Sequence, residues 1–198
     1  MKPITPALVT LLALAIATPA RAFSDIPDGP YNLWLVEHPV PTAPLYRARI
    51  AGVASYQRYQ GGATIAFSCR RDTPGVIVEL AFNPTPLDFD ADPYEGPDAT
   101  AHGPIIITSG HAPASSQRVS GRYGDGGPFD TGTPFIFGFS PSVAQVQSWT
   151  AARGQSLRVE VPAPAGGTPL TMQFRWPDDN AAFVRVVSPC LGKPADSH

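Results

Sequence analysis

The chain has 198 residues and a formal net charge of −2. Its length is enough to bury a core, and its acidic balance argues against nucleic acid or an anionic membrane as the main partner. Proline and glycine are frequent, at 24 and 18 residues. The aromatic and β-branched content nevertheless favours a folded all-β domain with many turns over a low-complexity chain.

The first 22 residues have the pattern of a signal peptide. Lys2 supplies a positive charge, residues 7–17 form an uncharged apolar run, and Ala20-Arg21-Ala22 has the small-x-small pattern of a cleavage site. A membrane anchor needs about 20 apolar residues, and this run is shorter. We therefore expect a periplasmic or secreted protein, without a membrane span in its mature form.

Cleavage defines the expected domain organisation. It leaves a single β-rich domain over residues 23–192 and a disordered tail over 193–198. Loss of Lys2 and Arg21 leaves 12 basic residues against 16 acidic ones, a net charge of −4. The basic residues are scattered along the sequence, and no stripe of basic and aromatic residues indicates a nucleic-acid partner.

The expected elements, taken in chain order, are mostly strands. Runs of alternating or β-branched residues predict strands at 31–37, 45–59, 64–69, 75–82, 104–108, 117–123, 134–140, 155–161 and 170–176. The run 45–59 is read as one strand or a bent pair, with a turn at Gly61-Gly62. The clearest hairpin joins 64–69 to 75–82 through the turn-rich residues 70–74.

Two short helices complete the expected secondary structure. The first covers 141–152, where Ser140 precedes a proline and where Val143, Val146 and Thr150 form one stripe. The second covers 179–187, capped by Asp178 or Asp179, although its β-branched valines keep a strand open as an alternative. The predicted fold class is all-β with two short helices, a β-sandwich or partly open barrel closed by one disulfide.

Residues 83–103 are expected to be a long surface loop. They contain prolines and acids but no apolar period, and loops of this length in compact domains are often functional. The loop is therefore the first place to look for a partner site.

A weak calcium loop is one hypothesis for this segment. Asp88, Asp90 and Asp92 place acids at alternate positions, as a calcium loop begins. The pattern then departs, because Pro93 stands where such a loop needs glycine and Ala99 where it needs the bidentate glutamate. The alternative is a solvated acidic loop.

Other motifs give little support to an enzyme. Asp130-Thr131-Gly132 is the triplet of aspartic proteases, but one copy supplies only one of the two carboxylates required. The four histidines lack the spacing of a metal pair, and neither Ser109 nor Ser140 lies in a G-x-S-x-G elbow. The carboxylates of Glu37 and Glu79 could form a pair across a sheet, as in an enzyme that uses two carboxylates. We expect Trp34, Trp149 and Trp176 to be core residues rather than a platform on which a ligand stacks.

Cys69 and Cys190 are the two cysteines of the chain. In an exported protein two cysteines most often pair, and the bridge would enclose about 120 residues. The alternatives are two free thiols or a metal site. The two cysteines lack the spacing of zinc ligands.

The order of these features resembles two related groups of small periplasmic proteins, the VasI-like accessory proteins of type VI secretion and the invasion-associated locus B family. The features are a leader, an early Trp-containing strand, an apolar strand that ends in cysteine, a second β run, a late alternating segment, and a final phenylalanine, helix and cysteine. The residues are Leu33-Trp34, Ile65-Ala-Phe-Ser-Cys69, Leu157-Arg-Val-Glu-Val161, Phe174, Ala181 to Val187, and Cys190.

The resemblance implies a β-rich domain closed by a disulfide from Cys69 to Cys190, with no catalytic set to transfer. The usual glycine before the closing helix is replaced here by Trp176-Pro177-Asp178, and the segment 83–103 is unusually long and acidic. We therefore expect a non-enzymatic envelope protein without a cofactor, which binds a protein or an envelope component as an accessory to secretion or host interaction. The alternatives are an inhibitor of a lysozyme-like cell-wall hydrolase and a hydrolase with a dispersed active site.

Overall fold

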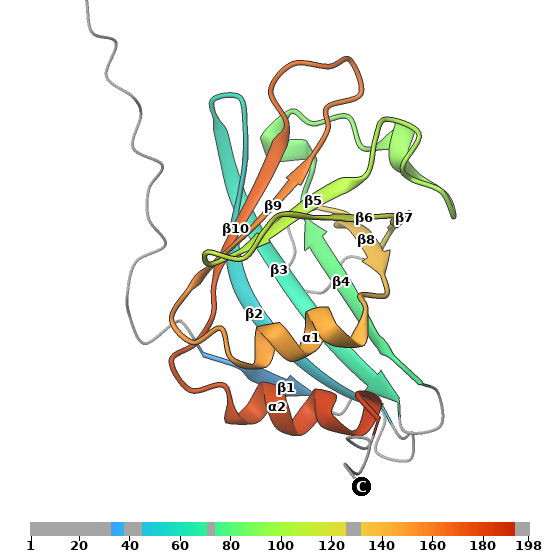
Figure 1. The fold of residues 1–198 in the computed structure, drawn as a ribbon. Helices are drawn as coiled ribbons and strands as arrows, with labels where there is room; N and C mark the ends of the chain where they lie inside the picture. The colour runs from blue at the N-terminus through green and yellow to red at the C-terminus, as the bar shows by residue number, and fades with distance from the viewer. Residues whose placement is uncertain (1–32, 38–44, 71–73, 126–131, 193–198) are drawn as a thin grey trace, which may run out of the picture.

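The computed structural model describes residues 33–37, 45–70, 74–125 and 132–192. The expected signal peptide and C-terminal tail lie outside these residues. The described residues form a single curled antiparallel sheet with two α-helices at one end (Figure 1). The strands are β1 (Leu35–Glu37), β2 (Leu45–Tyr56), β3 (Tyr59–Arg70), β4 (Val76–Phe82), β5 (Ile105–Ser109), β6 (Ser115–Gln117), β7 (Ser120–Tyr123), β8 (Phe135–Phe139), β9 (Ser156–Val161) and β10 (Leu170–Arg175). The expected all-β fold is confirmed.

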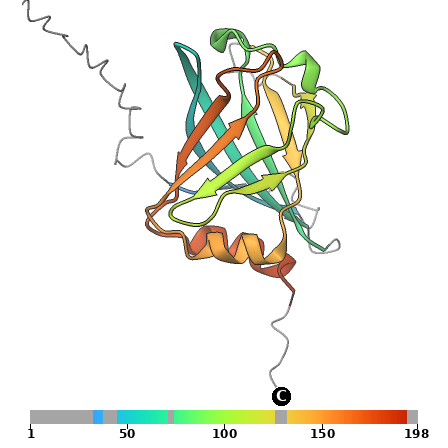
Figure 2. The same cartoon turned by 45° about the horizontal axis from the view of Figure 1, so that its top comes forward.

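The sheet is a partly open barrel rather than a sandwich (Figure 2). Its strand order is β6-β5-β9-β10-β2-β3-β4-β8-β7, with β1 pairing β2 beside this path. The two ends of the path, β6 and β7, are consecutive in the chain and joined by Arg118 and Val119. The run predicted as one strand over 117–123 is thus divided, because β6 pairs with β5 and β7 pairs with β8.

The long hairpin of β2 and β3 corrects one turn prediction. The two strands pair from Leu45↔Arg70 to Tyr56↔Tyr59, so the turn is Gln57-Arg58. Gln57 adopts the positive φ of 51° that a two-residue hairpin turn requires. Gly61 and Gly62 instead lie inside β3, where a Cβ on Gly61 would sit 3.5 Å from Leu87. That is an ordinary van der Waals distance, so crowding does not require a glycine at position 61.

Aromatic and aliphatic side chains fill the inside of the barrel. Successive side chains of a strand point to opposite faces, and this alternation appears in β4 and β8, where every second residue is buried. Phe135 and Phe137 are fully buried, and Phe137 stacks on Phe82. The alternate residues of these strands form the outer face of the sheet, which carries the site described below.

The helices α1 (Val143–Thr150) and α2 (Ala181–Val187) close the lower end of the barrel in Figure 1. Helix α1 begins later than predicted, because the hydroxyl of Ser142 rather than Ser140 caps it by accepting a hydrogen bond from the backbone N–H of Gln145 at 3.2 Å. Its buried side chains are Val146 and Trp149. Val143, expected on the buried stripe, is 42% exposed.

The open choice between helix and strand for 179–187 is resolved as helix. Phe183, Val186 and Val187 are buried, and their spacing of three and four residues places them on one helical face. Packing against the barrel therefore outweighs the low helix propensity of the valines. Of the two expected caps, Asp179 accepts a hydrogen bond from the backbone N–H of Ala181 at 2.8 Å.

A cluster of aromatic rings joins these helices to the sheet. Its members are Trp34, Phe67, Trp149, Trp176 and Phe183. Asn180 is 0% exposed, accepts a hydrogen bond from the indole N–H of Trp34 at 2.9 Å and donates to the carbonyls of Trp149 and Thr150. Trp149 and Trp176 are core residues, as expected, and Trp34 is partly buried and packs against the core.

The predicted disulfide is present between Cys69 at the end of β3 and Cys190 in the 3₁₀ helix Ser188–Cys190. The two cysteines are 121 residues apart in sequence. The bond fixes the segment that follows α2 to the middle of the sheet. A disulfide of this kind is typical of proteins outside the reducing cytoplasm.

Residues 83–103 were predicted to be a surface loop, and this prediction is wrong for the apolar side chains of the segment, which are buried. The segment contains the 3₁₀ helices Thr85–Leu87 and Asp92–Tyr94 and covers the other end of the barrel. Five of its side chains are buried in the core, namely Leu87, Phe89, Ala91, Tyr94 and Ala99. Their irregular spacing explains why no period was visible in the sequence. We call residues 83–103 the end plug.

Tyr94 of the end plug gives a testable pH dependence. Burial, with smaller contributions from Tyr56 and Asp90, raises the pKa of Tyr94 to about 12, whereas a tyrosine in an unfolded chain has a pKa of about 10. Stability from this group is therefore fully present below pH 10 and lost as the pH rises towards 12. We expect the free energy of unfolding, measured in urea, to fall between pH 10 and pH 12, and to fall less steeply for Tyr94→Phe. Equal slopes for the two proteins would contradict this assignment.

Candidate functional site

The three aspartates of the calcium hypothesis lie on the exposed surface of the end plug. Asp90 accepts a hydrogen bond from the backbone N–H of Asp92 at 3.2 Å, and the carboxylate of Asp92 accepts one from the hydroxyl of Tyr123. Among the described residues no group of three His, Cys, Asp or Glu side chains is placed to hold a metal ion. Calcium at Asp88, Asp90 and Asp92 remains a prediction without support from this geometry.

The other candidate residues are dispersed. His102 is exposed with its ring 5.4 Å from that of Tyr94, and His111 is exposed in the turn between β5 and β6. Most of the Asp-Thr-Gly triplet, with His38 and His198, lies outside the described residues. Ser109 is buried and accepts a hydrogen bond from the indole N–H of Trp176 at 2.9 Å, so it belongs to the core.

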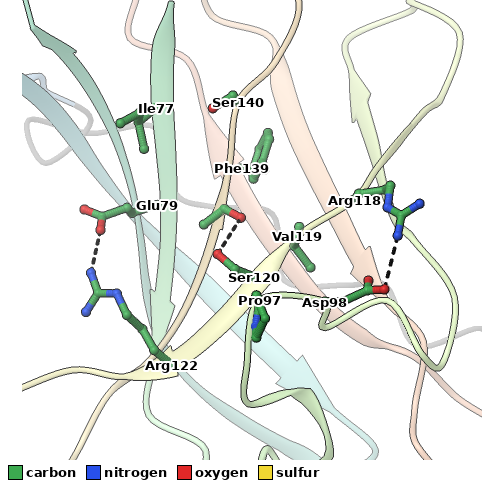
Figure 3. A pocket seen from close by; sticks show the side chains of 11 residues that line it. Ile77, Glu79, Pro97, Asp98, Arg118, Val119, Ser120, Arg122, Phe139 and Ser140 are labelled. Carbon is green, nitrogen blue, oxygen red and sulfur yellow. Dashed lines mark hydrogen bonds and ion pairs between the residues drawn. The ribbon is translucent and has the colours of Figure 1, made fainter. Parts of the chain in front are cut away.

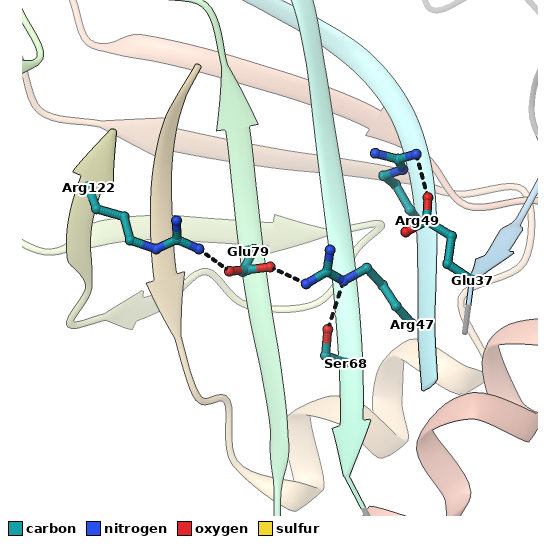
Figure 4. A network of polar contacts seen from close by, with 6 residues as sticks. All are labelled: Glu37, Arg47, Arg49, Ser68, Glu79 and Arg122. Atoms are coloured by element: carbon teal, nitrogen blue, oxygen red, sulfur yellow. Dashed lines mark hydrogen bonds and ion pairs between the residues drawn. The ribbon is translucent and has the colours of Figure 1, made fainter. Parts of the chain in front are cut away.

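Glu37 and Glu79 do not form the carboxylate pair considered from the sequence, since each binds an arginine. Glu37 binds Arg49 at 2.5 Å. Glu79 binds two arginines, Arg47 at 2.9 Å and Arg122 at 2.7 Å (Figure 4). This second arrangement is the centre of the candidate site.

Two adjoining pockets on the outer sheet face share Ile77 and Glu79. The larger has a volume of about 420 Å³ and the smaller about 170 Å³. The larger is lined by Ile77, Glu79, Pro97, Asp98, Arg118, Val119, Ser120, Arg122, Gly138, Phe139 and Ser140 (Figure 3). The smaller is lined by Arg47, Ser68, Arg70, Pro74, Gly75, Ile77 and Glu79. We call the two together the outer groove.

Sheet register brings these residues together. Arg47 of β2 pairs with Ser68 of β3, and Ser68 pairs with Ile77 of β4. In the next row of the same face, Glu79 pairs with Gly138 of β8, which pairs with Ser120 of β7. The outer groove therefore crosses the strands from β2 to β7. Gly138 keeps its floor open between Glu79 and Ser120.

Hydrogen bonds hold two arginines of the groove in place. Arg47 donates from Nε to the hydroxyl of Ser68 at 3.1 Å and from its terminal nitrogen to Glu79 Oε2 at 2.9 Å (Figure 4). Arg122 donates to Glu79 Oε1 at 2.7 Å. One carboxylate thus orients two guanidinium groups from opposite sides. The Glu79 side chain is 20% exposed, and such pairs stabilise a fold by about 1 kcal/mol or less.

The far side of the groove carries a second, looser ion pair. Arg118 lies 3.1 Å from Asp98, with the two side chains 81% and 60% exposed. The hydroxyl of Thr100, its backbone N–H and Arg118 lower the pKa of Asp98, which keeps this carboxylate charged. Because water screens an exposed pair of this kind, Arg118 can exchange Asp98 for another anion at small cost.

The chemistry of the outer groove is that of binding. Its polar groups are guanidinium donors, serine hydroxyls and two carboxylates that are already paired with arginines. Arginine is suited to planar recognition of carboxylates and phosphates, since its five N–H donors form a rigid fork. Arg47 and Arg122 use only some of these donors within the groove.

The sequence does not indicate this site. The basic residues are scattered along the chain, and Arg47, Arg70, Arg118 and Arg122 come together only in the folded protein. Arg47 and Glu79 are 32 residues apart, and Glu79 and Arg122 are 43 apart. The only sequence signal was the placement of charged residues at outward positions of alternating strands, and that pattern does not say which strands are neighbours.

No family model, curated protein or solved structure matches this chain. Across the residues that the structure describes, none of the helices has the length and apolar character needed to cross a membrane.

Proposed function

We propose that this protein is an exported, non-enzymatic binding protein of the bacterial envelope that docks a partner on its outer groove. The observation that carries the proposal is the groove itself, in which Glu79 orients Arg47 and Arg122 on a sheet. Four of the strands beneath it, β2, β3, β4 and β8, are paired on both sides, β7 is paired with β8, and the barrel behind them has a filled core. A surface that is ordered before binding loses little entropy when a partner docks.

The proposed location is the periplasm or the extracellular space. The disulfide between Cys69 and Cys190 fits an oxidising compartment, and the N-terminal pattern of residues 1–22 fits a cleaved leader. A disulfide-closed β-rich domain also fits the resemblance to secretion accessory and invasion-associated proteins. An accessory role in secretion or host interaction is therefore part of the proposal.

Inhibition of a cell-wall hydrolase is less well supported. An inhibitor that inserts a loop into an active site needs a protruding loop, and the segment expected to supply it, 83–103, packs its apolar side chains into the barrel. The outer groove offers a hollow rather than a projection. Inhibition is one of the outcomes that the following experiment separates.

The proposal is tested by placing a photo-crosslinking amino acid at Ile77, which is 50% exposed in the groove. Val184 on α2 is a matched control, since it is 36% exposed and lies outside both pockets. In cells that export the protein, we expect a discrete adduct with one partner from position 77 and none from position 184. Identical adducts at both positions, or none at position 77, would contradict the proposal. An adduct with a peptidoglycan hydrolase, accompanied by inhibition of that enzyme, would favour the inhibitor instead.

A further inference from the structure

The outer groove carries a charge opposite to that of the chain. Four arginines and two acidic residues line it, a formal charge of +2, whereas the chain as a whole has a net charge of −2. The four arginines are Arg47, Arg70, Arg118 and Arg122. A local positive surface on an acidic protein attracts an anionic partner and disfavours contacts elsewhere.

The cations stand on both sides of an apolar centre. Ile77 is shared by the two pockets and is 50% exposed. Arg47 and Arg70 belong to the pocket on one side of it, and Arg118 and Arg122 to the pocket on the other. A complementary ligand has an apolar group in the middle and anionic groups towards its ends.

The length of the groove sets the length of the ligand. Arg47 is on β2 and Arg122 on β7, which are separated by β3, β4 and β8. Four steps of about 4.8 Å between neighbouring strands give a span of about 19 Å for the strands under the groove. Within that span the guanidinium groups of Arg47 and Arg122 both reach inward to Glu79, at 2.9 and 2.7 Å. An extended peptide advances about 3.3 Å per residue, so about six residues cover this distance.

The mixed charge of the groove distinguishes a peptide from a polyanion. Glu79 and Asp98 would repel the closely spaced phosphates of a lipid surface or the sulfates of a polyanionic glycan. A peptide avoids this repulsion, because its carboxylates can bind the guanidinium groups while its backbone N–H groups face the two acids. The exposed side chain of Ile77 would also have no apolar partner in a purely polar ligand such as a glycan.

We propose that the outer groove binds an extended acidic segment of a partner protein, about six residues long, with carboxylates on both sides of an apolar side chain. This inference rests on the proposed binding function and gives the chemical class of the partner. Carboxylates of the segment take up the guanidinium donors that Arg47 and Arg122 leave available, and the apolar side chain covers Ile77. Glu79 is a positioning residue that presents the two arginines.

The experiment selects random heptapeptides displayed on phage against the full mature protein. We expect the selected peptides to be enriched in Asp and Glu on both sides of an apolar residue. A synthetic peptide of the selected sequence should lose about tenfold or more in affinity, measured by fluorescence anisotropy, for Arg47→Gln/Arg122→Gln, because charge-assisted hydrogen bonds are removed. The matched control is Arg153→Gln/Arg185→Gln, which removes the same charge from exposed positions outside the groove and should leave affinity unchanged.

Two further variants test separately the shape of the groove and the placement of its arginines. Gly138→Val fills the groove floor without changing charge and should weaken the same peptide, since a Cβ added at this position would lie 3.2 Å from the hydroxyl oxygen of Ser120. Glu79→Gln should also weaken the peptide despite making the groove more positive, because the two arginines lose their common anchor. Tighter peptide binding by Glu79→Gln would overturn its role as a positioning residue. Thermal unfolding of each variant checks that the fold is retained.

Three outcomes overturn the inference. They are selected peptides without excess acidic residues, equal affinity for the groove variant and its matched control, and preferential binding of phosphatidylglycerol vesicles over the peptide. If the photo-crosslink at Ile77 still captures one partner in these cases, the proposed function stands and only the acidic class is wrong. If neither peptide nor partner is found at the groove, both fail.

Discussion

Removal of the Cys69–Cys190 disulfide is expected to lower the free energy of unfolding by about 4 kcal/mol. The bond joins residues that are 121 positions apart, and a cross-link over a loop of this length restricts the unfolded chain by about 4 to 5 kcal/mol in the chain-entropy description. It also holds the C-terminal segment after α2 against β3. Urea unfolding of Cys69→Ala/Cys190→Ala, compared with the oxidised protein, measures the loss.

Two controls accompany this measurement. A reducing agent should destabilise the native protein by a similar amount and leave the double variant unaffected, because the variant has no bond to reduce. Non-reducing mass spectrometry of the mature protein should show Cys69 joined to Cys190. Two alkylatable thiols, or a change in stability below about 1 kcal/mol, would contradict the expected contribution.

Trp176→Ala is expected to cost about 3 to 5 kcal/mol of stability, the range found when a buried aromatic side chain is truncated in a core. The residue is 0% exposed, and its ring contacts those of Trp34, Phe67, Trp149 and Phe183. These rings join both helices to the sheet, so the cavity would form where the barrel end is closed. The free energy of unfolding in urea is the measurement.

The matched control for this substitution is Val184→Ala on the exposed side of α2. Val184 is 36% exposed, and substitutions at such sites usually change stability by about 0.5 kcal/mol or less. Trp176→Phe keeps an aromatic ring but loses the hydrogen bond to Ser109, so its cost should lie between the two. Equal effects of Trp176→Ala and Val184→Ala would show that the aromatic cluster does not stabilise the closed end.

Local patterns predicted individual strands well where each strand has one face in the core. The alternation of Val76 to Phe82 and of Phe135 to Phe139 is visible in the sequence and is the alternation of burial in β4 and β8. The same reasoning failed for Gly61 and Gly62, because glycine permits a turn but does not require one. Pairing of β2 with β3 keeps both glycines inside the strand, and the turn forms at Gln57-Arg58.

The end plug shows the corresponding limit for long segments. Leu87, Phe89 and Tyr94 are buried without a regular spacing, because turns and short 3₁₀ helices direct each side chain separately. No period exists for a sequence pattern to detect. The acids of the same segment and three of its four prolines are exposed, and these residue types predict a surface loop.

The all-β class, most strands and the pairing of the two cysteines can be predicted from the sequence, because they depend on the alternation of neighbouring residues and on the presence of one possible pair of cysteines. Folding in three dimensions sets the strand order of the partly open barrel, the inward packing of the end plug and the outer groove. The reason is that strand order and register are set by contacts between distant residues. Glu79 meets Arg47 and Arg122 only after five strands have paired in one order.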